Sequence, residues 1–396
     1  MQSNWEPGRS SSILLKFALN VEFILKRLQL SALLSAYPDI STGCWLSSFH
    51  DLPHLSAIPI PAVDCPSSSS VKLAMSQIVT KIQNFCNSNS SNPPITRVGV
   101  IGGDKFINQI LRAYVECLHH KSSSNWLHYL RFAMIPAPHS LMASFYKCAI
   151  AGLDGELDQL CHDMWERWVD LSPSERVSVI EKMTMWLTAG GGACVNLPIG
   201  EALLQMTERG QEVSCRVFVP FLAEVRVVHL FFHSSPPNSP HIRAADSREM
   251  DPSNVGGLEI STHWLFYPYN FNLPSYSQNV TPNSKKDVSK GSIKASFRTL
   301  VITRSCSQPL LSLNFVKEKK KEKMLQKLGM KKGQKTENDN PPVQVVAVSR
   351  LLCSCASKHA DLTVNVDGFT YERIRYFQCS SQWQTHVKSF PVSLIV

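Results

Sequence analysis

A short apolar segment, an amphipathic segment and a second apolar segment follow one another between Arg97 and Pro136. Residues 97–101 and 130–135 are typical of buried strands. Between them, apolar side chains recur at helical spacing: Ile107, Ile110, Leu111, Tyr114, Val115 and Leu118. Two parallel strands need a crossover of this length, and a helix supplies it. The pattern therefore predicts a β-α-β unit in an α/β fold.

The flanking segments extend this prediction. Residues 67–86 predict a helix that the preceding serines can cap, with one apolar face: Met75, Ile78, Val79, Ile82 and Phe85. A helical stretch follows the second strand, with Leu157, Leu160, Cys161, Met164 and Trp168 on one face. Another helix is predicted from Pro173, and a short one over 198–206. We expect a Rossmann-like parallel or mixed sheet with helices on both faces.

The C-terminal part is predicted to be rich in strands. Residues 213–232 are rich in Val and Phe and predict a strand with a bend at Pro220, and 257–267 and 293–303 predict two more. Asp367-Gly368 favours a hairpin turn after an alternating apolar run. Long polar loops are expected at 234–252 and 275–290, and a lysine-rich linker at 317–342.

The N-terminal segment, residues 1–43, stands apart as an amphipathic stretch. Its apolar positions follow a helical stripe between Leu14 and Ala32, which predicts a helix that packs on the core or docks on a partner. Lys16, Glu22 and Lys26 interrupt the apolar run, so a membrane-spanning helix is not expected.

The segment nearest to a known catalytic motif is the glycine-containing turn predicted at residues 99–103. It lies where a dinucleotide-binding loop would lie, but the residue three beyond Gly102 is Lys105, so the spacing is wrong. We interpret it as a tight turn between a strand and a helix, with a nucleotide-binding enzyme as the alternative. Gly190-Gly191-Gly192 lacks the Lys-Ser/Thr pair of a phosphate loop. We predict no enzyme activity, no catalytic residues and no cofactor.

Cysteine and histidine usage predicts no metal site. The 12 cysteines contain no Cys-x-x-Cys pair, and Cys353 and Cys355 lack a second pair that would complete a zinc site. We expect reduced, mostly buried thiols in a cytosolic protein. The pairs His119/His120 and His229/His233 are interpreted as structural or surface residues.

A net charge of +9 favours anionic partners. Aromatic residues are not interleaved with arginine, so nucleic acid is not expected. The candidate residues for binding an anionic partner are the lysines of one run: Lys317, Lys319, Lys320, Lys321, Lys323, Lys327, Lys331 and Lys332. The alternatives for this run are a solvated linker, a nuclear-import signal, a contact with an anionic membrane surface and a docking strip for acidic clusters.

An ordered series of rare residue combinations resembles the phosphofurin acidic cluster sorting (PACS) family. The C-terminal part of the series comprises residues 349–353 (SRLLC), 366–368 (VDG), 375–378 (RYFQ), 382–383 (QW) and 386–392 (HVKSFPV). Earlier segments that fit are 74–87, 126–132, 197–203, 219–221 and 294–298. The resemblance covers residues 44–396 and corresponds to the family's large C-terminal region.

The resemblance implies a role in membrane traffic. Members of the family are cytosolic connectors that bind acidic-cluster tails of membrane proteins, ion channels and coat adaptors. They act between the trans-Golgi network, endosomes and the plasma membrane, and no catalytic activity or cofactor is expected from them. The family's cargo-binding region precedes the part that matches here, so no cargo-contact residue is carried over. Residues 1–43 do not match, which we interpret as an alternative start or a wrongly joined gene model.

Overall fold

The structure is a computed structural model that describes residues 44–48, 52–57, 62–121, 125–150, 154–188, 193–207, 214–230, 258–263, 290–295, 297–317, 342–354 and 361–394. The chain divides into two compact units, residues 1–197 with 389–396, and residues 198–388. We call them unit 1 and unit 2. No helix in the described ranges is long and apolar enough to cross a membrane.

Unit 1 is built on a sheet of six strands in the order β2-β1-β3-β4-β17-β5. The strands are β1 (Cys44–Ser47), β2 (Ala62–Asp64), β3 (Thr96–Gly102), β4 (Leu130–Pro136), β5 (Cys194–Pro198) and β17 (Ser389–Ser393). The helical elements are the 3-10 helix η1 (Pro53–Ala57), α2 (Ser68–Ser88), α3 (Asp104–His119), α4 (Trp126–Tyr129), α5 (Leu141–Ala149), α6 (Asp154–Trp165) and α7 (Pro173–Thr188). The pairs that join β2, β1, β3, β4 and β17 are parallel.

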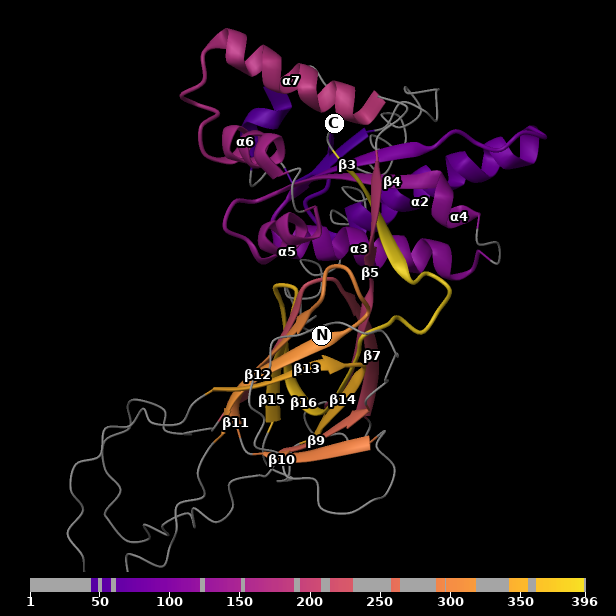
Figure 1. Cartoon of the computed structure of the whole chain (residues 1–396). Coiled ribbons are helices and arrows are strands. Elements are labelled where there is room, and N and C mark those ends of the chain that lie inside the picture. Colours follow the sequence, from indigo (N-terminus) through magenta and orange to yellow (C-terminus); the bar gives the residue numbers. More distant parts are fainter. Residues whose placement is uncertain are drawn as a thin grey trace, which may run out of the picture. The chain divides into compact units, whose positions relative to one another are not determined.

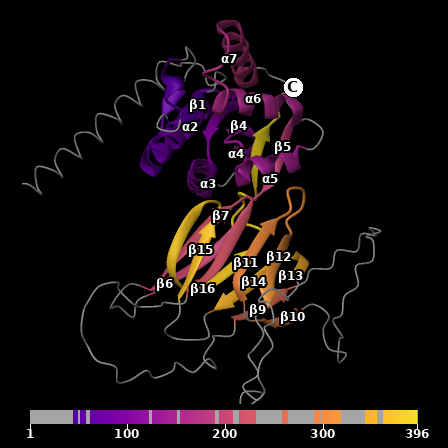
Figure 2. The same cartoon turned by 90° about the vertical axis from the view of Figure 1, so that its left-hand side faces the viewer.

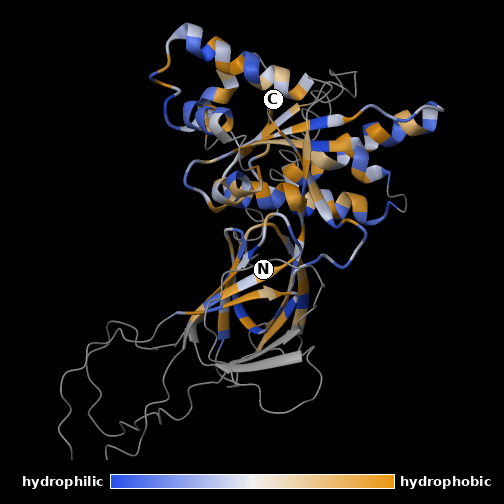
Figure 3. Ribbon diagram, viewed as in Figure 1, coloured by the Kyte–Doolittle hydropathy of each residue, from blue (hydrophilic) through white to orange (hydrophobic). Residues whose placement is uncertain are grey.

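The predicted β-α-β unit is confirmed as β3, α3 and β4. Residues of β3 are buried throughout, and α3 turns one apolar face to the sheet. The helix before it, α2, begins as the serines predict, because Ser67 and Ser70 form a reciprocal capping box. Figure 3 shows helices of unit 1 that carry both hydrophobic and hydrophilic residues, as expected of helices that cover a sheet.

Helices lie on both faces of the sheet in unit 1, as predicted. In Figures 1 and 2, α3 and α5 lie on one side of β3 and β4, and α6 and α7 lie on the other. On the α3 side, Tyr114 meets Phe132 edge-on, with ring centroids 5.4 Å apart. On the α7 side, Trp186 meets Trp45 of β1 edge-on at 6.2 Å. Each face thus has its own aromatic packing.

The last strand, β17, returns to the sheet of unit 1. Val392 pairs with Phe132 of β4, and Phe390 stacks on Phe132 with ring centroids 4.2 Å apart. Tyrosine hydroxyls bind both ends of the strand: Tyr114 donates to the carbonyl of Ser389 at 3.2 Å, and Tyr146 donates to that of Ser393 at 3.1 Å. The chain therefore leaves unit 1 after β5 and closes it again with its final strand.

Unit 2 is an antiparallel sheet that curves around its own core (Figure 2). The order is β10-β9-β14-β16-β15-β8-β11-β12-β13, and β6 pairs with β16 and β7. The strands are β6 (Gly200–Thr207), β7 (Ser214–Phe221), β8 (Glu224–Leu230), β9 (Leu258–His263), β10 (Lys290–Ala295), β11 (Phe297–Arg304), β12 (Leu311–Lys317), β13 (Pro342–Val348), β14 (Arg350–Ser354), β15 (Asp361–Val366) and β16 (Phe369–Ser380). The predicted strand-rich C-terminal part is confirmed.

The long strand β16 changes partners along its length. Its first half pairs with β15, and its second half pairs with β14 and β6. Arg373 has a positive φ of 58°, next to the register shift between Ile374 and Tyr376. The predicted hairpin turn before this strand is confirmed, because Asp367 and Gly368 both have positive φ, as a type I′ turn requires.

Two predictions about the start of unit 2 are wrong. Residues 198–206 are not a helix: Pro198 ends β5, and the segment continues as strand β6 between β7 and β16. Ala, Leu, Glu and Met favour helix in isolation, but antiparallel pairing on both sides overrides this preference. The strand predicted over 213–232 with a bend at Pro220 is instead two strands, separated at Leu222 and Ala223.

Some predicted segments lie outside the described residues. These are the N-terminal stretch 1–43, the loop 234–252, nearly all of the loop 275–290, and the linker 317–342 apart from its two ends, Lys317 and Pro342.

Candidate functional site

The glycines at the end of β3 are explained by packing, because Gly99 and Gly102 both belong to this strand. A Cβ atom on Gly99 would lie 2.1 Å from the ring of Trp45, and one on Gly102 would lie 2.5 Å from the ring of Phe106. Both positions therefore exclude larger side chains for reasons that involve no ligand. Residues 99–102 are strand, so the predicted turn over 99–103 is reduced to Gly103, which alone separates β3 from α3.

Asp104, which follows this turn, binds the first turn of α5. Its carboxylate accepts hydrogen bonds from the backbone amides of Leu141 at 3.2 Å and Met142 at 2.8 Å. The Ser140 side chain accepts a third from Ala143 at 3.0 Å. The amides that would attract an anion at this helix N-terminus thus already have acceptors within the protein.

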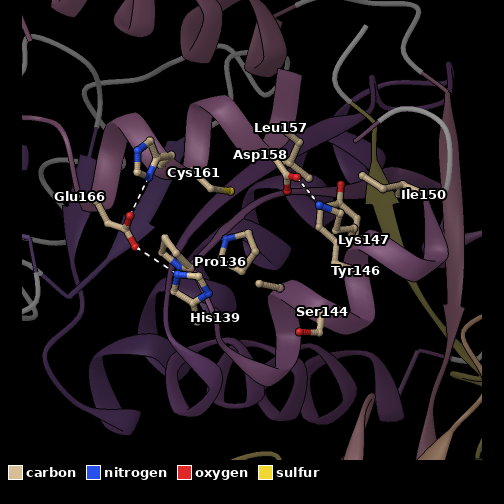
Figure 4. Close-up of a pocket in the computed structure, with 13 residues that line it drawn as sticks. Pro136, His139, Ser144, Tyr146, Lys147, Ile150, Leu157, Asp158, Cys161 and Glu166 are labelled. Carbon is tan, nitrogen blue, oxygen red and sulfur yellow. Dashed lines mark hydrogen bonds and ion pairs between the residues drawn. The ribbon is translucent and has the colours of Figure 1, made fainter. Parts of the chain in front are cut away.

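A cavity of about 300 Å³ lies beyond the carboxyl end of β4 (Figure 4). Pro136, the last residue of β4, forms part of its wall, and α5 and α6 supply most of the rest. This is the edge of an α/β sheet where ligands commonly bind. Its lining is Pro136, Pro138, His139, Ala143, Ser144, Tyr146, Lys147, Ile150, Leu157, Asp158, Cys161, His162 and Glu166.

Paired charges surround this cavity. Glu166 lies between two imidazoles, 2.6 Å from Nδ1 of His162 and 3.7 Å from Nε2 of His139. Lys147 of α5 forms an ion pair with Asp158 of α6 (Figure 4). His139 is 91% exposed and adopts a left-handed backbone with φ of 59°. Exposed pairs of this kind contribute about 0–1 kcal/mol each, so they shape the opening more than they stabilise the fold.

The buried polar groups of the cavity are protonated at neutral pH. Burial raises the pKa of the Cys161 thiol to about 12. Burial also raises the pKa of Tyr146 well above its usual range, and its hydroxyl already donates to Ser393. A thiol held neutral is a poor nucleophile.

The lysine run is only partly described. Lys317 is the last residue of β12. The other seven predicted residues, Lys319, Lys320, Lys321, Lys323, Lys327, Lys331 and Lys332, lie outside the described residues. The role of the run as a binding strip remains a prediction.

The predicted histidine and cysteine roles are partly visible. His119 ends α3, and its ring meets that of His120 at 4.8 Å. Cys353 is buried in β14, whereas Cys355 lies outside the described residues. Within the described ranges, no group of three or more His, Cys, Asp and Glu residues is arranged to hold a metal ion.

Sequence reasoning singled out none of the residues around the cavity as a site. One signal was available: Pro136 closes a buried parallel strand, and the loop after such a strand lies at the edge where ligands bind. The cavity also depends on α6, which approaches α5 at this edge of the sheet through the ion pair between Lys147 and Asp158.

The family model described as "PACS-1 cytosolic sorting protein" matches residues 41–254 and 233–396. The chain belongs to this family. Human phosphofurin acidic cluster sorting protein 1 is 27% identical over 380 residues, which cover 84% of this chain and 38% of that protein. Human phosphofurin acidic cluster sorting protein 2 is 26% identical over 400 residues, 90% of this chain and 44% of that protein. The chain thus spans less than half the length of these relatives.

One solved structure is similar at a low level. Yeast NADH kinase in complex with NADH has a TM-score of 0.38 and 9% identity, over 94% of this chain and 80% of the kinase chain. A likeness of this degree carries no argument about fold or activity.

Proposed function

We propose that this chain acts in membrane traffic as an adaptor that binds membrane cargo or ion channels and directs their localisation. The observation that carries the proposal is the match to a family of cytosolic sorting proteins from residue 41 to residue 396. The relatives are named for sorting acidic clusters, so acidic cytosolic tails are the proposed cargo. The proposed compartments are the trans-Golgi network, endosomes and the plasma membrane, with coat adaptors as further partners.

The charge of the chain supports an acidic partner. The net charge is +9, and eight lysines are concentrated between Lys317 and Lys332. Lysines near an anionic surface contribute about 1 kcal/mol each, so a run of eight could dominate binding at low salt. Phosphorylation of a tail would strengthen such contacts, because each phosphoryl group adds up to two negative charges.

The cavity of unit 1 supports binding rather than catalysis. Its lining combines apolar side chains and a neutral thiol with charged side chains that are paired with one another. A segment that carries one apolar side chain beside charged residues would fit this arrangement.

Capture of peptides by the whole chain tests the proposal. The bait is an acidic-cluster peptide in phosphorylated and unphosphorylated forms. We expect the phosphorylated form to retain more protein, and added salt to weaken retention. A variant with the eight lysines changed to glutamine should lose most of it. The matched variant with the same lysines changed to arginine should keep it, because the charge is preserved. Equal and negligible capture by both peptides would remove cargo binding from this chain.

A further inference from the structure

Two arginines lie side by side where β3 and β4 begin. Arg97 of β3 is the register partner of Arg131 of β4 in a parallel pair. Neighbouring strands run about 4.8 Å apart, and paired residues of parallel strands point to the same face of the sheet. The two side chains therefore leave the sheet together, at its amino edge and away from the cavity beyond β4.

Arg97 is a buried cation whose guanidinium has no protein partner in the described part of the chain. Its exposed fraction is 6%. No described hydrogen bond or ion pair joins its guanidinium to a carbonyl or a carboxylate. Burial lowers the pKa of Arg97, and the neighbouring charge of Arg131 lowers it further. Arg97 is thus a residue with little exposed surface whose neighbouring charge is a second cation, Arg131.

Arg131 is held in place by neutral acceptors. One of its terminal nitrogens donates to the carbonyl of Leu130 at 2.9 Å and to that of Leu127 at 3.2 Å. Among the described residues, no carboxylate lies within ion-pair distance of it. The backbone therefore orients the guanidinium without neutralising it.

A pair of cations without counter-charge is destabilising when it is removed from water. The same arrangement is favourable when an anion lies between the two guanidiniums. Each guanidinium presents a planar set of N–H donors that matches the oxygens of a phosphoryl group or a carboxylate. A phosphoryl group brings up to two negative charges for two cations, whereas a carboxylate brings one.

We propose that Arg97 and Arg131 form a binding site for a phosphoryl group. The site includes none of the lysines of the run. It goes beyond the proposed sorting function, because its chemistry fits free phosphate as well as a phosphorylated protein segment. Only the second source connects the site to acidic, phosphorylated cargo.

Thermal unfolding of the whole chain tests the site with inorganic phosphate as the probe. Unfolding is followed in phosphate and in sodium chloride of equal ionic strength, for the wild type, Arg97→Met and Arg131→Met. A ligand that binds only the folded state raises Tm. We expect phosphate to raise the Tm of the wild type and to leave both variants unchanged. The matched control is Arg226→Met in unit 2, which removes one exposed arginine paired with Glu224 and should retain the shift.

The same experiment separates a binding role from a structural one. Without phosphate, Arg97→Met should be at least as stable as the wild type, because an uncompensated buried charge has been replaced by an apolar side chain of similar length. A Tm that falls equally in both buffers would show that Arg97 is structural and would overturn the proposal. Arg97→Lys serves as the conservative variant: it keeps the charge but not the planar donors, and it should show a reduced phosphate shift.

Calorimetric titration with a phosphoserine peptide and its unphosphorylated form shows whether the bound phosphoryl group comes from a phosphorylated segment or from free phosphate. Binding of the phosphopeptide that weakens about tenfold or more in Arg97→Met would assign the site to a phosphorylated segment. Binding of inorganic phosphate alone would assign it to a small free oxyanion. If neither phosphate nor phosphopeptide binds the wild type, the site does not exist. That outcome leaves the lysine-dependent capture of cargo unaffected, so the two proposals fail separately.

Discussion

Trp45 packs so closely on β3 that the position beneath its ring accepts only glycine. The ring is fully buried, and a Cβ on Gly99 would lie 2.1 Å from its Cε3 atom. A Cβ on Gly103, four residues later, would have no neighbouring atom within 4 Å. The two glycines look alike in sequence, yet one is fixed by packing and the other is not.

We expect Gly99→Ala to destabilise unit 1 strongly and Gly103→Ala to be tolerated. The first forces Trp45 or β3 to move, and overpacking of this kind costs about 1–3 kcal/mol or more. The second adds a methyl group in open space at φ of −78°, which any residue adopts. Chemical denaturation of both variants checks this. Equal stability of the two variants would contradict the packing of Trp45 on β3.

His54 predicts a pH dependence of stability. Its ring stacks on Trp168 with centroids 4.8 Å apart, its Nε2 is buried without a partner, and burial lowers its pKa below 6.5. The unfolded state therefore binds the proton more readily than the folded state. The contribution of His54 is present above the unfolded pKa and is lost as pH falls from about 6.5. The His54→Phe variant keeps the ring stack but does not titrate. The difference between its Tm and that of the wild type should therefore be larger in the variant's favour at about pH 5.5 than at about pH 7.5. A difference that stays constant with pH would contradict this.

At the scale of elements, one carboxylate joins two turns of unit 2. Asp367, in the hairpin turn between β15 and β16, accepts hydrogen bonds from the backbone amides of Leu222 at 2.7 Å, Ala223 at 3.1 Å and Glu224 at 2.9 Å. These amides belong to the turn between β7 and β8 and to the first residue of β8. The sequence predicts the hairpin from Asp367-Gly368, but it does not show that the aspartate also binds a turn far away in the chain.

We expect Asp367→Asn to destabilise unit 2 by at least about 2 kcal/mol, because hydrogen bonds to a charged acceptor contribute about 1.5–3 kcal/mol each. Asparagine tolerates the positive φ, so the effect reports the lost carboxylate and not backbone strain. Thermal unfolding measures it, with the exposed Glu372→Gln on β16 as the control. A loss no larger than that of the control would contradict the assigned role.

Elements whose pattern is local are the ones that the sequence predicts well. The helices α2 and α3 have one apolar face, α7 begins at Pro173 as predicted, and β3 and β4 are short apolar runs. Strand β6 is mispredicted because its residues favour helix until β7 and β16 pair with it. Strand β17 has an ordinary strand pattern, but its partner β4 is chosen by tertiary packing.

At the scale of the whole molecule, the fold class and the family could be predicted, whereas the sites could not. Residues 349–392 carry residue combinations that are specific to the family and can be recognised without knowledge of the fold. The cavity beyond β4 and the pair Arg97 and Arg131 arise from contacts between separate elements, and no spacing along the chain encodes them. An arginine within a buried strand was the one local signal of the pair.

Sorting itself is tested most directly by the location of a cargo. The measurement is the fraction of a membrane reporter at the cell surface, in cells with and without this chain, when the reporter carries an acidic-cluster tail or the same tail with its acids changed to amides. We expect the chain to change the surface fraction of the acidic reporter and to leave the neutral one unchanged. An identical surface fraction of the acidic reporter with and without the chain, at matched expression, would contradict the account.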